Sequence, residues 1–161
     1  MPDVTIKTHP AVSGVGLKYR GKNENDEIGQ MWGAIVDRME HIPSLVQPLN
    51  VGYVISVMDE AFESTGEFDY IGGYPVSAKA ADLPEALIAF DVPAGDYAVI
   101  TCPDLAGIQG AFDSLYNRWL PKSDAALDIS HGNFCFELYG EEFDLQAGKE
   151  TFTIWVPVKA K

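Results

Sequence analysis

The most regular pattern in the chain is the segment from Asn133 to Phe143, which reads NFCFELYGEEF. Large apolar residues alternate there with residues of other kinds. In a strand, successive side chains point to opposite faces. The apolar face holds Phe134, Phe136 and Leu138. The other face places Glu137 between Cys135 and Tyr139. The pattern therefore predicts a strand with one side built for a core and a second side that carries a single acid among large side chains.

The charge of the chain is strongly negative. Its 161 residues contain 11 Lys and Arg against 24 Asp and Glu, a net charge of −13. Such a surface repels phosphate backbones and anionic lipids and attracts cations, so we expect no direct binding of nucleic acid. We expect no membrane span either, because no apolar run approaches the roughly 20 residues that a span needs.

Cysteines and histidines show no metal-binding spacing. Cys102 and Cys135 lie in hydrophobic stretches and are typical of reduced residues in a cytoplasmic protein. The first ten residues lack the apolar core of a signal peptide. We therefore predict a cytoplasmic protein with no metal site and no cofactor. The histidines are scattered at His9, His41 and His131.

Two amphipathic helices are predicted. Apolar residues recur at three- and four-residue steps from Asp26 to His41, around Trp32, and again from Pro103 to Pro121, around Trp119. Between and around the helices, alternation and turn residues predict strands. These are Asp3–Arg20 as a strand or broken pair, Val51–Met58, Phe68–Ala78 with a bulge at Gly72-Gly73, Ala86–Val92, Tyr97–Cys102 and Thr151–Lys159.

The remaining segments are predicted as connections. Pro93–Asp96 is a turn of the kind that joins the two strands of a hairpin, Asp59–Gly66 an acidic turn, and Lys122–Gly132 a polar loop. The order strand–helix–strand–strand then occurs twice. This predicts an α+β fold in a single domain, 1–161, with halves of roughly 1–80 and 81–161. Its antiparallel strands would form a sheet with both helices on one face.

Several of these segments together resemble one family. They are YIGGYPVS, PAGDYAVI, LYNRWLPKSD, FCFELYG and FTIWVPVK. In this order and spacing they resemble the GyrI-like small-molecule-binding domain, the effector-binding module of some AraC- and MerR-type transcription regulators. The resemblance implies a stand-alone member with two βαββ halves, related by a pseudo-two-fold axis, and a central ligand cleft between them.

The resemblance also implies a ligand site. The acid that meets cationic ligands in multidrug-sensing members corresponds to Glu137, with Tyr139 two residues on. Alternation alone favours an exposed sheet position for Glu137, and the resemblance favours a pocket. The aromatic residues that we expect to line the cleft are Trp32, Tyr53, Tyr70, Trp119 and Trp155. For Trp155 the pattern leaves two possibilities, the same cleft as Glu137 or an exposed position.

Three functions follow as hypotheses. The first is binding of amphipathic, cationic, drug-like or xenobiotic molecules by an aromatic cleft with an acidic floor. The second is hydrolysis of strained electrophilic genotoxins, with Glu137 as general base or electrostatic stabiliser and a tyrosine as proton donor. The third is interaction with a protein partner, either gyrase or a separate DNA-binding regulator, since the chain shows no helix-turn-helix of its own.

Overall fold

The computed structural model of the chain describes residues 3–22, 24–25, 27–38, 42, 45–46, 51–78, 83, 86–140, 143–144 and 147–161. Its strands are β1 (Val4–His9), β2 (Val12–Gly21), β3 (Gly52–Val57), β4 (Phe68–Val76), β5 (Ile88–Val92), β6 (Gly95–Cys102), β7 (Ala125–Leu127), β8 (Phe134–Tyr139), β9 (Phe143–Asp144), β10 (Lys149–Glu150) and β11 (Phe152–Ala160). Its helices are α1 (Glu27–Arg38), α2 (Glu60–Thr65) and a helical run that contains α3 (Ile108–Asp113).

One antiparallel sheet organises the molecule, in the order β1-β6-β11-β8-β3-β4-β2-β5. The order is symmetric about its centre, where β3 pairs with β8. On one side lie β4 and β2, and on the other lie β11 and β6, their counterparts in the second half of the chain. The α+β class expected from the sequence is confirmed.

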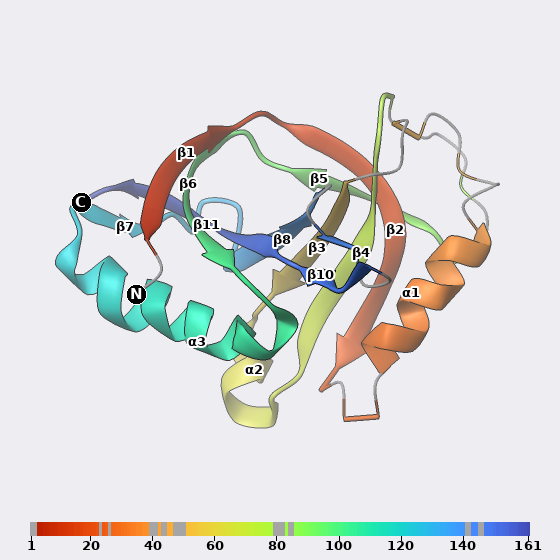
Figure 1. Cartoon of the computed structure of the whole chain (residues 1–161), viewed down its shortest axis with the longest axis horizontal. Helices are drawn as coiled ribbons and strands as arrows, with labels where there is room; N and C mark the ends of the chain where they lie inside the picture. Colours follow the sequence, from red (N-terminus) through yellow and green to blue (C-terminus); the bar gives the residue numbers. More distant parts are fainter. Residues whose placement is uncertain are drawn as a thin grey trace.

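The two halves exchange their first strands. β1 pairs with β6 of the second half, and β5 pairs with β2 of the first half. Between β1 and β2 the chain makes one long arch across the molecule (Figure 1). Each half-sheet is therefore completed by a strand of the other half.

The hairpin predicted around Pro93–Asp96 is wrong. β5 and β6 are joined there, but they do not pair with each other. Both edges of β6 are already occupied, by β1 on one side and by β11 on the other. The connection is held instead by Tyr97, whose hydroxyl donates to the carbonyl oxygen of Pro93 at 2.6 Å.

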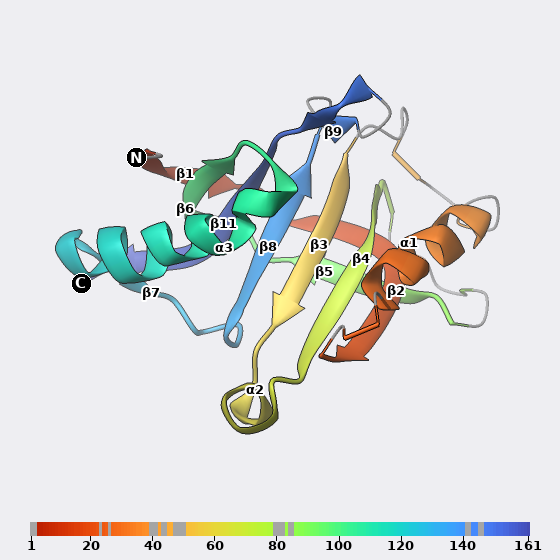
Figure 2. The same cartoon turned by 60° about the horizontal axis from the view of Figure 1, so that its bottom comes forward.

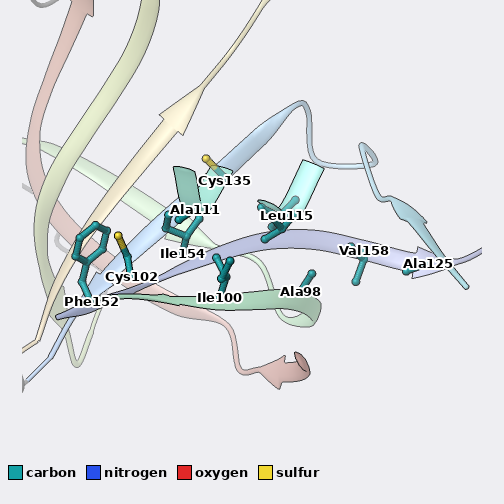
Figure 3. Packing of buried hydrophobic residues seen from close by; sticks show 11 residues of the cluster. Ala98, Ile100, Cys102, Ala111, Leu115, Ala125, Cys135, Phe152, Ile154 and Val158 are labelled. Carbon is teal, nitrogen blue, oxygen red and sulfur yellow. The ribbon is translucent and has the colours of Figure 1, made fainter. Parts of the chain in front are cut away.

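The two predicted helices, α1 and the run that contains α3, pack on the same face of the sheet. α1 buries Met31 and Ile35 in a cluster with Val54 of β3. α3 and the helical turn after it bury Ala111 and Leu115 against β6 and β11 (Figure 3). The helices cover the two outer parts of the sheet, and β8 and β3 lie between them (Figure 2). The predicted arrangement of two helices on one face is confirmed.

The opposite face carries a separate aromatic core. His9 is buried there, with ring centroids 5.3 Å from Phe136 and 5.1 Å from Trp155. Tyr53 and Tyr97 complete the ring of aromatic side chains around His9. Along β8, Phe134, Phe136 and Leu138 lie on this face, whereas Cys135 and Glu137 lie on the helix-bearing face. This is the alternation predicted from the sequence.

The second helix is more irregular than its sequence pattern. The run consists of a 3₁₀-helix (Leu105–Gly107), α3, a π-helix η3 (Ser114–Trp119) and a second 3₁₀-helix (Leu120–Lys122). Asp104 caps its start, since its carboxylate accepts from the backbone N–H of Gly107 at 2.7 Å. The first helix spans Glu27–Arg38, and the remaining residues of its predicted range, 26 and 39–41, lie outside the described residues.

Two predicted connections contain secondary structure. The expected turn at 59–66 holds the short helix α2, and the expected loop at 122–132 holds β7, which pairs with the end of β11. A third expectation, the bulge at Gly72-Gly73, is wrong, because β4 keeps an unbroken register with β2 and β3. Within the described part of the chain, no helix has the length and apolar character needed to cross a membrane.

The glycines of β4 allow a close crossing of strands rather than a bulge. A Cβ atom at Gly73 would lie 2.2 Å from the carbonyl oxygen of Val15 and 2.7 Å from Cα of Gly16. Both contacts are with backbone atoms of β2, which cannot move aside as a side chain does. Glycine at this position is therefore a packing requirement.

We expect Gly73→Ala to lower the free energy of unfolding by about 1–3 kcal/mol or more, because the added methyl group forces two strands apart. Gly33→Ala is the matched control. Its Cβ meets nothing within 4 Å, and helix propensity favours alanine there by about 0.5–1 kcal/mol. Urea denaturation of both variants measures the difference. Equal effects of the two substitutions would contradict the close crossing.

Candidate ligand-binding site

Glu137 lies at the centre of the sheet. Its neighbours in register are Ile154 on β11 and Val54 on β3. Both are fully buried, and Glu137 itself is only 6% exposed. Residues directly opposite in an antiparallel pair share a face, so all three side chains lie on the helix-bearing side. The acid is a buried residue of the seam between the two halves, not an exposed sheet residue.

Among the described residues, the carboxyl group of Glu137 has one polar partner and no cation. The hydroxyl of Tyr139 donates to its Oε1 at 2.6 Å. Burial raises the pKa of Glu137 from its ordinary value of 4.5 to about 7, and the hydrogen bond from Tyr139 opposes that shift. Among the residues that the structure describes, no Lys, Arg or His forms an ion pair with Glu137. The ion pairs found join Lys18 and Arg20 to Asp69, Arg20 to Asp59, and Arg118 to Asp113.

Aromatic side chains of the second half flank the acid on one side. The ring of Tyr139 stacks on Phe152 with centroids 4.8 Å apart, and it makes a T-shaped contact with Phe143 with centroids 4.7 Å apart. These contacts hold the Tyr139 ring while its hydroxyl reaches Glu137. Burial first, and then the charge of Glu137, raise the pKa of Tyr139, so it remains a hydrogen-bond donor at neutral pH.

Residues of the first half approach from the other side. The indole Nε1 of Trp32 donates to the hydroxyl of Tyr70 at 3.1 Å, and the rings of Trp32 and Tyr74 make a T-shaped contact with centroids 6.1 Å apart. Burial, followed by the charge of Glu137, raises the pKa of Tyr70. Trp32 and Tyr139 both pack against the buried cluster that contains Tyr70 and Val54. The structure thus brings four of the predicted residues together: Trp32, Tyr70, Glu137 and Tyr139.

Gly72 is a residue of this site that sequence reasoning missed. It is paired with Val54, the register neighbour of Glu137. A Cβ atom at Gly72 would lie 2.9 Å from Cζ2 of Trp32 and 3.3 Å from Cε of Met31. Because Gly72 has no side chain, the indole of Trp32 can pack directly against the backbone of the sheet. Two adjacent glycines inside a predicted strand were the available signal, since such glycines mark close approaches.

Tyr53 and Trp155 are not brought to Glu137. Trp155 is the register partner of Phe136, the neighbour of Glu137 along the strand, so its side chain lies on the opposite face. It is 8% exposed, and its Nε1 donates to Thr153 at 2.8 Å. Both positions that the pattern allowed for Trp155 are therefore wrong. Tyr53 lies on that face too, with its hydroxyl 3.3 Å from Nε2 of His9.

Trp119 also lies away from the acid. It is half-buried at the C-terminal end of η3, against the outer edge of the core formed with β6 and β11. There it lines a hollow of about 410 Å³ together with Asp3, Val4 and residues of the helical run. The region around Glu137 thus combines a buried acid with aromatic side chains from both halves.

The fold is that of an α+β domain with two helices on one face of a single antiparallel sheet. The sequence model of the integron-associated effector-binding proteins, Cass2, matches residues 5–158. The chain belongs to this family of effector-binding domains, and the GyrI-like resemblance found in the sequence is confirmed.

Known proteins agree with this assignment. The transcriptional regulator BrlR of Pseudomonas aeruginosa is 34% identical over 139 residues, which are 86% of this chain and 48% of BrlR. The chain thus spans about half the length of this curated relative. The C-terminal domain of EcmrR matches with a TM-score of 0.75 at 14% identity, over 100% of this chain and 99% of that domain.

Two further structures share the fold. SAV2435 bound to tetraphenylphosphonium matches with a TM-score of 0.69 at 15% identity, over 98% of this chain and 94% of that protein. The integron cassette protein VCH_CASS2 from the mobile metagenome of Vibrio cholerae matches with a TM-score of 0.62 at 16% identity, over 97% and 95% of the two chains.

The raised pKa of Glu137 predicts a pH dependence of stability. The unfolded chain releases this proton near pH 4.5 and the folded chain near pH 7, so its contribution to the free energy of unfolding falls as pH rises between these values and is level above. The Glu137→Gln variant has no carboxyl group at this position, so it does not lose stability in this way. We expect the free energy of unfolding of the variant, relative to that of the wild type, to increase by about 1–3 kcal/mol from pH 4.5 to pH 8.

Urea denaturation at the two pH values measures this difference. Glu63→Gln, which removes an exposed acid on α2, serves as the control and should show no such change. A Glu137→Gln difference that is the same at both pH values would show that the carboxyl group titrates normally in the folded chain.

Proposed function

We propose that this chain binds amphipathic organic cations in an aromatic cleft whose floor is the carboxyl group of Glu137. The observation that carries the proposal is a buried acid with a tyrosine hydrogen bond and no cationic partner among the described residues. A buried charge is costly unless it is paired. A cationic ligand would supply the partner.

The walls suit a flat or bulky apolar cation. Trp32 and Tyr139 come from opposite sides of the seam, and both remain half-buried rather than sealed in the core. A cation over an aromatic face gains about 0.5–2 kcal/mol from each ring. The net charge of −13 adds a long-range attraction for cations and raises the rate of encounter.

The comparisons support the same ligand class. Tetraphenylphosphonium, with which the structure of SAV2435 was determined, is a bulky lipophilic cation. It joins a delocalised positive charge to four phenyl rings, so it can pair with an acid and contact several aromatic side chains at once. We take this compound as the first probe for the present chain.

We further propose that ligand binding regulates transcription through a DNA-binding part. BrlR is a transcriptional regulator, and this chain matches about half of it. The fold also matches EcmrR in a complex with DNA, with a TM-score of 0.76 at 13% identity over 99% of this chain and 58% of that one. The charge of this chain makes it a poor surface for DNA, so the contact with DNA would come from elsewhere. Interaction with gyrase, the other partner considered from the sequence, remains a prediction.

Removal of the acid should weaken cation binding. We expect Glu137→Gln to raise the Kd for tetraphenylphosphonium by about 10- to 100-fold, because a charge-assisted contact with a desolvated carboxylate contributes about 1.5–3 kcal/mol. Calorimetric titration of the wild type and the variant at pH 8 measures the change.

The exposed acid Glu63 again offers a matched control, since Glu63→Gln removes the same charge far from the seam. An equal loss of affinity in both variants would reduce the effect to net charge and overturn the assigned role of Glu137. A hydrolysed product from a cyclopropane-bearing cation would point instead to the hydrolase considered from the sequence.

Cation affinity should also depend on pH. The ligand prefers the ionised carboxylate, and Glu137 carries a proton below its pKa of about 7. The affinity is therefore expected to rise by up to about tenfold per pH unit below pH 7 and to level off above it. Titrations from pH 5.5 to 8.5 measure the profile. The Glu137→Gln variant should give a flat profile, and a wild-type profile that is equally flat would contradict ligand binding to this carboxylate.

A further inference from the structure

The hollow beside Trp119 is separate from the Glu137 site. It has a volume of about 410 Å³ and lies between the start of β1 and the end of the helical run. Asp3 and Val4 form its strand side, and Ser114, Arg118, Trp119 and Lys122 belong to its helical side. Residues of the Glu137 site do not contribute to its lining.

The charges of this hollow differ from those of the rest of the molecule. The chain has only 11 Lys and Arg residues, and two of them, Arg118 and Lys122, line this one hollow. The Nε of Arg118 binds Asp113 at 3.0 Å, whereas its two Nη atoms bind no group of the described residues. Lys122 has no ion pair with the described residues. The unused donors of Arg118 form a fork that suits a carboxylate.

The π-helix is what brings these residues to one side. In an α-helix, residues five positions apart are separated by about 140° around the axis, because each turn takes 3.6 residues. The hydrogen bonds of a π-helix join residues five apart, so Ser114 and Trp119 approach the same side of η3. Such segments are frequently found at functional sites. The irregular helix thus presents an indole ring, a hydroxyl and a guanidinium to one hollow.

We propose that this hollow is a second ligand site, which takes a small aromatic carboxylate. The ring of the ligand packs on Trp119 and Val4, and its carboxylate meets the Nη atoms of Arg118 and the ammonium of Lys122. Ser114 supplies a hydroxyl donor. Asp3 lies on the opposite side of the hollow and disfavours anions of higher charge, so the site prefers a monoanion. The ligand class is thus opposite in charge to that proposed for Glu137.

Benzoate is a suitable probe, with benzamide as its neutral analogue and acetate as its analogue without a ring. The chain has three tryptophans, so three indole N–H signals report on it in ¹H–¹⁵N NMR spectra. We expect benzoate to shift the Trp119 signal in a saturable way and to leave those of Trp32 and Trp155 in place. Benzamide and acetate should each bind at least about threefold more weakly.

Variants separate this site from general attraction of an anion to cations. Lys122→Gln and Arg118→Gln should each weaken benzoate binding by about threefold or more, and Asp3→Asn should strengthen it. Lys22→Gln removes an exposed lysine elsewhere and should change nothing. Glu137→Gln should also leave benzoate binding unchanged, so failure of the cation site would not affect this result.

Three outcomes would overturn the proposal. The first is a Trp119 signal that does not move with benzoate. The second is benzamide binding as tightly as benzoate, which would leave no role for the two cations. The third is a Lys22→Gln variant that loses as much affinity as Lys122→Gln, which would reduce the interaction to net charge.

Discussion

The buried carboxyl group of Glu137 is the constraint on which the rest of the site depends. Strands β11 and β3 hold its position from both sides, so the acid cannot turn to solvent without opening the centre of the sheet. Tyr139 supplies one hydrogen bond, which offsets part of the cost of burial. The cost of burial that is not offset raises the pKa of Glu137, because burial disfavours the charged form. A group with a pKa shifted in this way commonly marks a functional site.

The exchange of first strands stabilises the seam against the cost of burying Glu137. β1 completes the half-sheet of β6, and β5 completes that of β2, so neither half has its full set of strand partners alone. Separating the halves would break these pairings as well as the central one between β3 and β8. The acid therefore lies at an interface held together at three places. A ligand in the seam would contact side chains from both halves.

The helical run from Leu105 to Lys122 serves two surfaces at once. Its inner side buries Leu115 in the core beside β11, its exposed side carries Arg118, and Trp119 packs at the edge of the core and lines the hollow. The π-helical turn allows both, because it changes which residues share a side. Sequence periodicity predicted an ordinary α-helix here, and the family resemblance led us to expect Trp119 in the cleft. Nothing in the residue pattern marks the change of helix type.

The sequence by itself determined the local features: the alternation of β8, the amphipathic helices, the α+β class and, through family resemblance, the choice of Glu137 and Tyr139 as candidate site residues. These depend on residues close in the chain, where periodicity is informative. Only the tertiary structure decided which strands pair, and hence which aromatic side chains share a face with Glu137. Trp155 and Tyr53 face away because register at the centre of the sheet, a non-local property, sets their side. The site is thus a product of strand pairing, which no local pattern encodes.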